Sequence, residues 1–111
     1  MEKTDKISLY RAVGVEEFAS IIELSKFTIP DCGVGVKYFG LNFEETLVFA
    51  NDNFNNGIIA IFEATIAKNI LEEIGDFTHV DRFIFKSGTV IISAEDLEVF
   101  NNSIQEIIHK Y

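Results

Sequence analysis

Two short apolar segments carry the residues of this chain that are best suited to chemistry. The first is Leu9-Tyr10-Arg11-Ala12-Val13, and the second is Val36-Lys37-Tyr38-Phe39-Gly40. Both segments have the pattern of strands that lead into amphipathic helices. Where such strands converge on a cleft, these two would bring a cation and an aromatic ring to it.

Arg11 is the most informative single residue, because it lies inside an apolar strand. The charge of an arginine cannot be removed, so a half-buried Arg11 must find an anion or several hydrogen-bond acceptors. Two interpretations are open. Arg11 is either an edge-strand residue paired with a surface carboxylate, or a clamp for a phosphate or carboxylate, for which the forked guanidinium is well shaped.

The second segment offers a cation, Lys37, followed by two rings, Tyr38 and Phe39. Strand alternation puts the two rings on opposite faces of the strand. One ring must face the core. The other either covers a helix or forms the wall of a site for a flat ligand, and the segment taken alone favours core packing for both rings.

Other polar groups have ordinary explanations beside functional ones. Glu95, Asp96 and Glu98 lie at the head of the last expected helix, where acids commonly stabilise the first turn. Glu63 is a carboxylate in an apolar strand, and His79 is either a solvated loop residue or a general base near an aspartate. The chain has no nucleophile elbow, zinc-protease motif, P-loop or dinucleotide fingerprint, and we expect no metal site.

Hydrophobic periodicity predicts the elements that must position these residues. We expect strands over residues 7–13, 36–40, 58–66, 83–85 and 89–92, with a Lys86-Ser87-Gly88 turn between the last two. Helices are expected after Gly14, after Asn42, over residues 68–74 and from Ser93 to the C-terminus. The sequence therefore predicts an α+β fold with about four helices in one domain, residues 1–111.

Three details of these helices are specific enough to check. Asn42 is expected to cap the second helix, with Glu45 in the capping-box position, and Gly75 to end the third. The first helix should bury a face made of Val15, Phe18, Ala19 and Ile22. The last helix should bury a stripe that runs to the C-terminus, made of Leu97, Phe100, Ile104, Ile107 and Ile108.

Composition narrows the function classes. The 111 residues are 48% hydrophobic and include eleven phenylalanines, enough for a core without disulfides or metals. The single cysteine, Cys32, favours a reducing compartment. No segment resembles a signal peptide or a membrane span, so we expect no membrane partner and a cytoplasmic location, or delivery into the cytoplasm of a target cell. The net charge of −9 argues against general nucleic-acid binding and favours either a basic partner or simple solubility.

Several stretches together resemble a known family. The segment Leu9-Tyr10-Arg11-Ala12-Val13, a helix ending near Ser25-Lys26-Phe27, the glycine-rich loop and KYFGLNFEETLVFAN (residues 37–51) resemble the N-terminal half of small ADP-ribosyltransferase-like toxin domains. Such domains occur in bacterial polymorphic toxins and as free effectors. The tail FTHVDRFIFKSGTVIISAEDLEVFNNSI (residues 77–104) resembles their later part.

The resemblance implies a split, twisted β-core that clamps NAD in a bent form and transfers ADP-ribose to a macromolecular target. Cleavage of the nicotinamide–ribose bond builds positive charge on the ribose, which a carboxylate stabilises. By position, Arg11 would be the first catalytic motif, Tyr38 the second and Glu95 the third. NAD would contact Arg11, Lys37, Tyr38 and Phe39.

Two other functions compete with a transferase. The last strands contain no Glu-x-Glu or Gln-x-Glu pair, and the acidic charge is typical of immunity proteins and inhibitors. The chain is then a non-catalytic binding protein, either an inactive relative of the fold or an acidic antagonist of a toxin. A third interpretation is a structural subunit that self-associates through a surface rich in phenylalanine.

Overall fold

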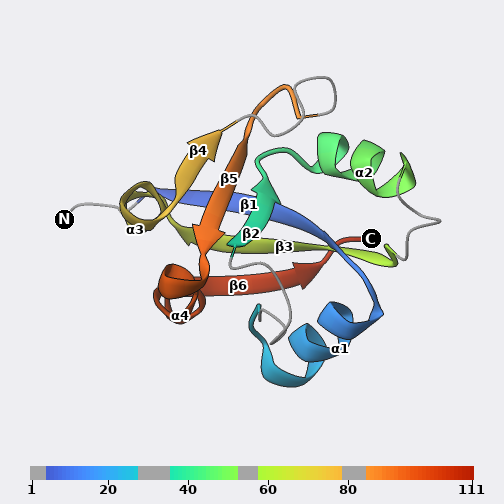
Figure 1. The fold of residues 1–111 in the computed structure, drawn as a ribbon, viewed down its shortest axis with the longest axis horizontal. Coiled ribbons are helices and arrows are strands. Elements are labelled where there is room, and N and C mark those ends of the chain that lie inside the picture. The colour runs from blue at the N-terminus through green and yellow to red at the C-terminus, as the bar shows by residue number, and fades with distance from the viewer. Residues whose placement is uncertain (1–4, 28–35, 53–57, 79–84) are drawn as a thin grey trace.

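The computed structural model describes residues 5–27, 36–52, 58–78 and 85–111, and these form one antiparallel sheet of six strands with four helices (Figure 1). The strand order in the sheet is β4-β5-β2-β1-β3-β6. In chain order the elements are β1 (Lys6–Val13), α1 (Val15–Leu24), β2 (Val36–Gly40), α2 (Phe43–Asp52), β3 (Ala60–Ala67), α3 (Lys68–Ile74), β4 (Asp76–Thr78), β5 (Thr89–Ser93), α4 (Ala94–Ser103) and β6 (Ile104–His109). The predicted α+β class is confirmed.

The sheet is joined unevenly. Strand β1 pairs with β3 along its whole length, and β2 pairs with β5 along its whole length. Between β1 and β2, in contrast, the register has a single pair, Tyr10 with Gly40. The sheet thus consists of two three-stranded halves, β4-β5-β2 and β1-β3-β6, which part on one side of that pair.

The two faces of the sheet are covered by different helices. Phe39 and Phe62 lie on one face, where Phe100 of α4 packs 5.0 Å from Phe39 and Phe18 of α1 packs 5.7 Å from Phe62, centroid to centroid. Helix α2 lies on the other face and appears apart from α1 and α4 in Figure 1. The largest fully buried side chains of the core are Phe27, Phe39, Phe100, Leu9, Ile61, Ile66, Leu71 and Ile92.

Local signals that the sequence carries are confirmed at several element ends. The Asn42 carbonyl accepts from Thr46, and the Asn42 side chain accepts from the backbone N–H of Glu45 at 3.0 Å, as an N-cap should. Gly75 ends α3 by donating its N–H to the Leu71 carbonyl at 2.7 Å. The turn before β5 is also present, and its Gly88 has a φ of 96°, a conformation that favours glycine.

The prediction that the last helix reaches the C-terminus is wrong. Helix α4 ends at Ser103, and Ile104–His109 forms β6, which pairs with β3. The isoleucines of this segment fit a helical stripe, but their β-branched side chains also suit a strand. Strand β3 is buried, and its second edge needs a partner because unpaired N–H and C=O groups are costly there.

Two other expectations need correction. In α1 the buried residue is Ile21, whereas the predicted face residues Val15 and Ile22 are 66% and 60% exposed. The three-residue edge strand β4 was not expected at all. The strand predicted over residues 83–85 falls mostly outside the described residues, as does His79, and Phe85 directly precedes the turn.

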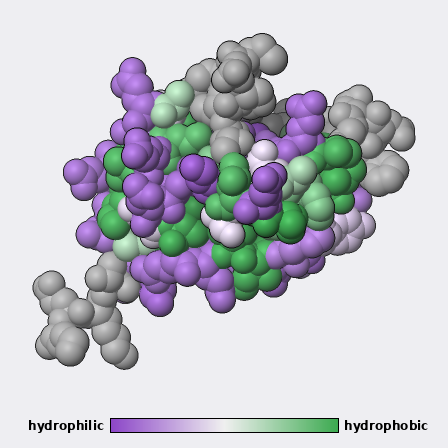
Figure 2. All heavy atoms as spheres, turned by 90° about the horizontal axis from the view of Figure 1, so that it is seen from below, coloured by the Kyte–Doolittle hydropathy of each residue, from purple (hydrophilic) through white to green (hydrophobic). Residues whose placement is uncertain are grey.

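The described surface mixes polar and apolar groups. Figure 2 views the molecule from below the orientation of Figure 1 and shows hydrophobic and hydrophilic residues interspersed over that side. Exposed apolar side chains of α1 and α4 include Leu24 and Val99. Within the described ranges, no helix has the length and apolar character that crossing a bilayer requires.

Candidate functional site

A cavity of about 180 Å³ lies where the two half-sheets part. Strands β1 and β2 and helix α2 supply most of its walls, and the segment around the turn before β5 supplies the rest. The lining residues are Tyr10, Arg11, Ala12, Tyr38, Phe39, Gly40, Thr46, Phe49, Phe85 and Thr89. Because aromatic and apolar groups dominate this set, the cavity suits a flat ligand group that has few charges.

The two rings of β2 divide as strand alternation predicts. Phe39 is 1% exposed and belongs to the core, in edge contact with Phe27 at 5.1 Å between ring centroids. Tyr38 is 43% exposed and lines the cavity. Core packing, the interpretation favoured for both rings, is therefore wrong for Tyr38, whose ring lies at the wall of the cavity.

Arg11 bridges the two halves of the sheet. Its Nη1 donates to the Tyr38 carbonyl at 2.8 Å, beside the point where the β1–β2 ladder stops. Its Nε and Nη2 donate side-on to the Glu17 carboxylate of α1 at 2.5 and 3.0 Å. Arg11 and Tyr38, predicted from separate segments, are therefore brought together.

Lys37 is buried on the α1 side of β2, with 3% of its surface exposed. Its Nζ lies 3.3 Å from the same Glu17 oxygen that accepts from Arg11 Nη2. Burial lowers the pKa of Lys37, the nearby Arg11 charge lowers it further, and Glu17 offsets part of this effect. The cluster thus sets two cations against one carboxylate.

Glu95, the predicted third catalytic residue, is not brought to the cavity. It is exposed in the first turn of α4, just after Ser93. Ser93 pairs with Val36, while the cavity residues Gly40 and Thr89 pair at the opposite ends of the same two strands. None of the described residues that line the cavity is acidic.

Sequence reasoning missed Glu17. The available signal was Arg11 itself, because an arginine in an apolar strand needs a nearby anion and Glu17 stands in the first turn of the helix that follows. The ion pair and the apolar contacts of α1 fall on the same face of the helix. The helix turns Glu17, Phe18 and Ile21 toward the sheet, which leaves Ile22 outside.

Tyr10 and Glu63 form a second polar pair beside the cavity. The Tyr10 hydroxyl donates to Glu63 Oε2 at 2.9 Å, and Lys110 Nζ lies 4.0 Å from Glu63 Oε1. Burial raises the pKa of Tyr10 above its usual 10.0, and the hydrogen bond and charge of Glu63 raise it further. Burial and Glu63 therefore both favour the protonated form of Tyr10.

The raised pKa of Tyr10 predicts a loss of stability in alkali. As pH rises past 10.0, the unfolded chain releases the tyrosine proton before the folded chain does, so the free energy of unfolding falls until the folded pKa is passed. Urea titrations across this range should show a shallower decline for Tyr10→Phe than for wild type. Tyr111→Phe, at an exposed position, should follow wild type. If the free energy of unfolding declines equally for wild type and Tyr10→Phe, Tyr10 is not the group whose raised pKa causes the loss.

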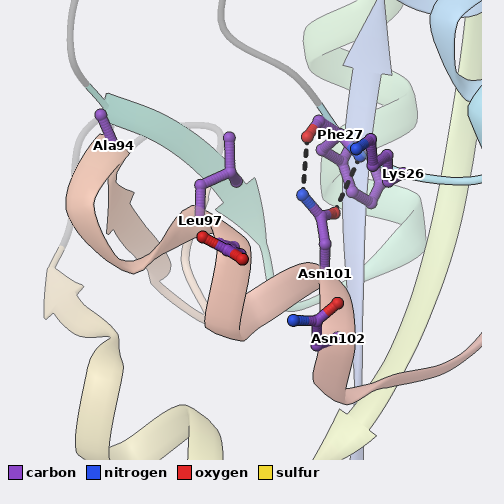
Figure 3. Close-up of a pocket in the computed structure, with 7 residues that line it drawn as sticks. Lys26, Phe27, Ala94, Leu97, Asn101 and Asn102 are labelled. Atoms are coloured by element: carbon purple, nitrogen blue, oxygen red, sulfur yellow. Dashed lines mark hydrogen bonds between the residues drawn. The ribbon is translucent and has the colours of Figure 1, made fainter.

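A larger hollow of about 460 Å³ lies beside α4, and its lining includes neither Arg11 nor Tyr38 (Figure 3). The Asn101 side chain points across it to Phe27, where it accepts from the backbone N–H at 2.9 Å and donates to the carbonyl at 2.8 Å. Figure 3 shows both bonds as dashed lines. Asn101 thus forms with the Phe27 backbone the two hydrogen bonds that a neighbouring strand would form. We interpret this contact as an anchor for the chain at Phe27.

Comparison with known proteins gives no match: no family model, no curated protein and no solved structure corresponds significantly to this chain. Among the described residues, no three His, Cys, Asp or Glu side chains form a group able to hold a metal ion.

Proposed function

We propose that this domain is a non-catalytic relative of ADP-ribosyltransferase-like toxin domains and that it binds the nicotinamide ring of NAD in the cavity between its half-sheets. One observation carries the proposal. The sheet parts after a single β1–β2 pair, and Arg11 and Tyr38, the residues aligned with the first two family motifs, meet at that point. A split core with these residues at the split is what the resemblance implies.

The lining of the cavity supports a ring as the ligand group. Tyr38, Phe49 and Phe85 offer aromatic surfaces, and the volume of about 180 Å³ lies below that of pockets that enclose drug-sized ligands. Thr46 and Thr89 also line the cavity, and both of their hydroxyls donate to backbone carbonyls, those of Asn42 and Thr78. We therefore assign the cavity to the nicotinamide end of NAD, with the remainder of the dinucleotide outside it.

The lack of an acidic residue in the described lining supports binding without transfer. Transfer needs a carboxylate close to the ribose, where positive charge develops. Glu17 pairs with Arg11 and Lys37, and Glu63 accepts a hydrogen bond from Tyr10. Glu95 lies in the first turn of α4, beyond the end of β5 that is remote from the cavity. In this proposal the domain works in a cytoplasm, its own or that of a target cell.

Calorimetric titration of NAD and of nicotinamide, combined with an assay of nicotinamide release, tests this proposal. Binding of both ligands without release is the expected result. Release of nicotinamide would favour an active transferase with a protein target and would overturn the non-catalytic assignment. No binding at millimolar ligand would overturn the NAD assignment.

The second candidate function, an acidic antagonist of a toxin, is supported by the net charge of −9. Such a protein covers a basic partner and needs no small ligand. Expression in bacteria separates it from a toxin, because an active transferase should arrest growth, whereas a binding protein should be harmless. Failure of NAD to bind, together with harmless expression, would favour this candidate.

Truncation of the exposed ring should weaken ligand binding. Tyr38→Ala removes one aromatic wall of the cavity, and stacking of a ring on an aromatic side chain contributes about 1–3 kcal/mol, so the affinity for nicotinamide should fall roughly tenfold. Phe77→Ala is the matched control, since Phe77 is similarly exposed and lies outside the cavity lining. Equal affinities for the two variants would show that Tyr38 does not contact the ligand.

A further inference from the structure

The Arg11–Lys37–Glu17 cluster carries more positive charge than its described partners neutralise. The side chains of Arg11 and Lys37 are 21% and 4% exposed, and both pair with Glu17, which is 16% exposed. One carboxylate thus serves two partly or fully buried cations. This excess stands out in a chain whose net charge is −9.

The geometry of Glu17 resembles that of a bound oxyanion. Its two oxygens accept side-on from Nε and Nη2 of Arg11, the two-point arrangement that guanidinium groups form with carboxylates and phosphates alike. One of these oxygens, Oε1, also lies 3.3 Å from Lys37 Nζ. Arg11 and Lys37 therefore converge on a single anion position, and a side chain of the protein fills it.

A phosphate matches this position better than a carboxylate does in charge. Two cations require two negative charges, and a glutamate supplies one, whereas a pyrophosphate bridge such as that of NAD carries at least two, spread over both phosphates, and offers acceptor oxygens on each. Charges left unbalanced in a buried cluster are costly. The lowered pKa of Lys37, caused first by burial and then by Arg11, is consistent with this shortfall.

We infer that Arg11 and Lys37 form a subsite for a phosphate group and that Glu17 is its built-in occupant, which a ligand phosphate must displace. Arg11 is also among the residues that line the cavity, so it is shared between the subsite, which lies on the α1 face of the sheet, and the cavity, which lies under α2. The inference deepens the proposed function, because NAD would bring both a ring and phosphates. It makes Glu17 an internal competitor that weakens binding of every phosphate-bearing ligand.

The test removes the competing charge and keeps the shape of its side chain. Glu17→Gln should bind inorganic pyrophosphate about tenfold more tightly than wild type in calorimetry. Pyrophosphate should also raise the melting temperature of Glu17→Gln more than sodium chloride does at equal ionic strength. Glu16→Gln is the matched control, because Glu16 is the exposed neighbour on the same helix. The double variant Glu17→Gln/Lys37→Gln should lose the gain.

Equal pyrophosphate affinity for wild type, Glu16→Gln and Glu17→Gln would overturn the inference, and so would an unchanged gain in the double variant. If Glu17→Gln does not fold, Glu17→Asp replaces it, because aspartate keeps the charge and withdraws it by one methylene. Glu17→Asp should bind pyrophosphate more tightly than wild type, and an unchanged affinity would overturn the inference. Nicotinamide carries no phosphate and reports on the cavity alone. Its failure to bind, with pyrophosphate binding intact, would reject the proposed function and leave the subsite standing.

Discussion

Phe100→Ala should lower the free energy of unfolding by about 3–5 kcal/mol, the usual cost of truncating a fully buried phenylalanine. Phe100 has no exposed surface and joins α4 to the sheet through its contacts with Phe27 and Phe39, at 6.0 and 5.0 Å between ring centroids. Its removal would leave a cavity beside the rings of Phe27, which follows α1, and Phe39 of β2. A loss of this size is a large part of the stability of a small domain.

Chemical denaturation monitored by circular dichroism measures this effect. Val99→Ala provides the control, because Val99 is the neighbour of Phe100 on the same helix and is 48% exposed. That variant should shift the unfolding midpoint only slightly. An unchanged midpoint for Phe100→Ala would mean that this ring does not anchor α4 as the structure indicates.

The sequence predicted Phe100 as a core residue correctly, although it predicted the end of the same helix wrongly. Leu97 and Phe100 fit a helical stripe, and both are buried. Ile104 and Ile107 continue that spacing, but their segment is β6. Periodicity cannot separate the two outcomes for a short apolar run. The deciding factor is the open edge of β3, which is a property of the assembled sheet.

The candidate site shows the same division between local and long-range information. Alternation along β2 is a local property, and it correctly placed the two rings on opposite faces, but it did not specify that Phe39 would be the core ring and Tyr38 the exposed one. The meeting of Arg11 with Tyr38 was expected because both strands were expected to converge. The contact of Glu17 with Arg11 depends on how α1 is rotated, and the place of Phe85 in the cavity wall depends on where the turn before β5 packs. No pattern within either segment specifies these features.

Glu45 shows how a correct local prediction can miss a tertiary contact. The residue stands in the expected capping-box position, but its carboxylate accepts from the backbone N–H and the hydroxyl of Ser87, at 3.1 and 2.9 Å. This contact ties the turn before β5 to α2. It holds the neighbouring Phe85 against Phe49, with 5.5 Å between the ring centroids, and so completes one wall of the cavity.

Gly40→Ala should abolish ligand binding in this cavity and destabilise the fold. A methyl group at Gly40 would lie 2.5 Å from Thr46 Oγ1 and 3.0 Å from a ring carbon of Phe85, both in the cavity wall. Thr46 cannot turn away freely, because its hydroxyl donates to the Asn42 carbonyl at 2.9 Å. Overpacking of this kind typically costs about 1–3 kcal/mol.

The position of Gly40 makes the effect larger than crowding alone would. Gly40 is the residue of β2 in the single register pair with β1, so a displacement there acts on the junction of the two half-sheets. Nicotinamide affinity should fall below detection in calorimetry, and the denaturation midpoint should fall with it. The double variant Gly40→Ala/Thr46→Ala lacks the closest clashing atom, Thr46 Oγ1. Its loss of unfolding free energy should therefore be smaller than the sum of the losses in the two single variants. If the stability losses of the two single variants simply add in the double variant, the contact between Gly40 and Thr46 does not set the width of the cavity. The half-sheets would then move apart more readily than their single register pair implies.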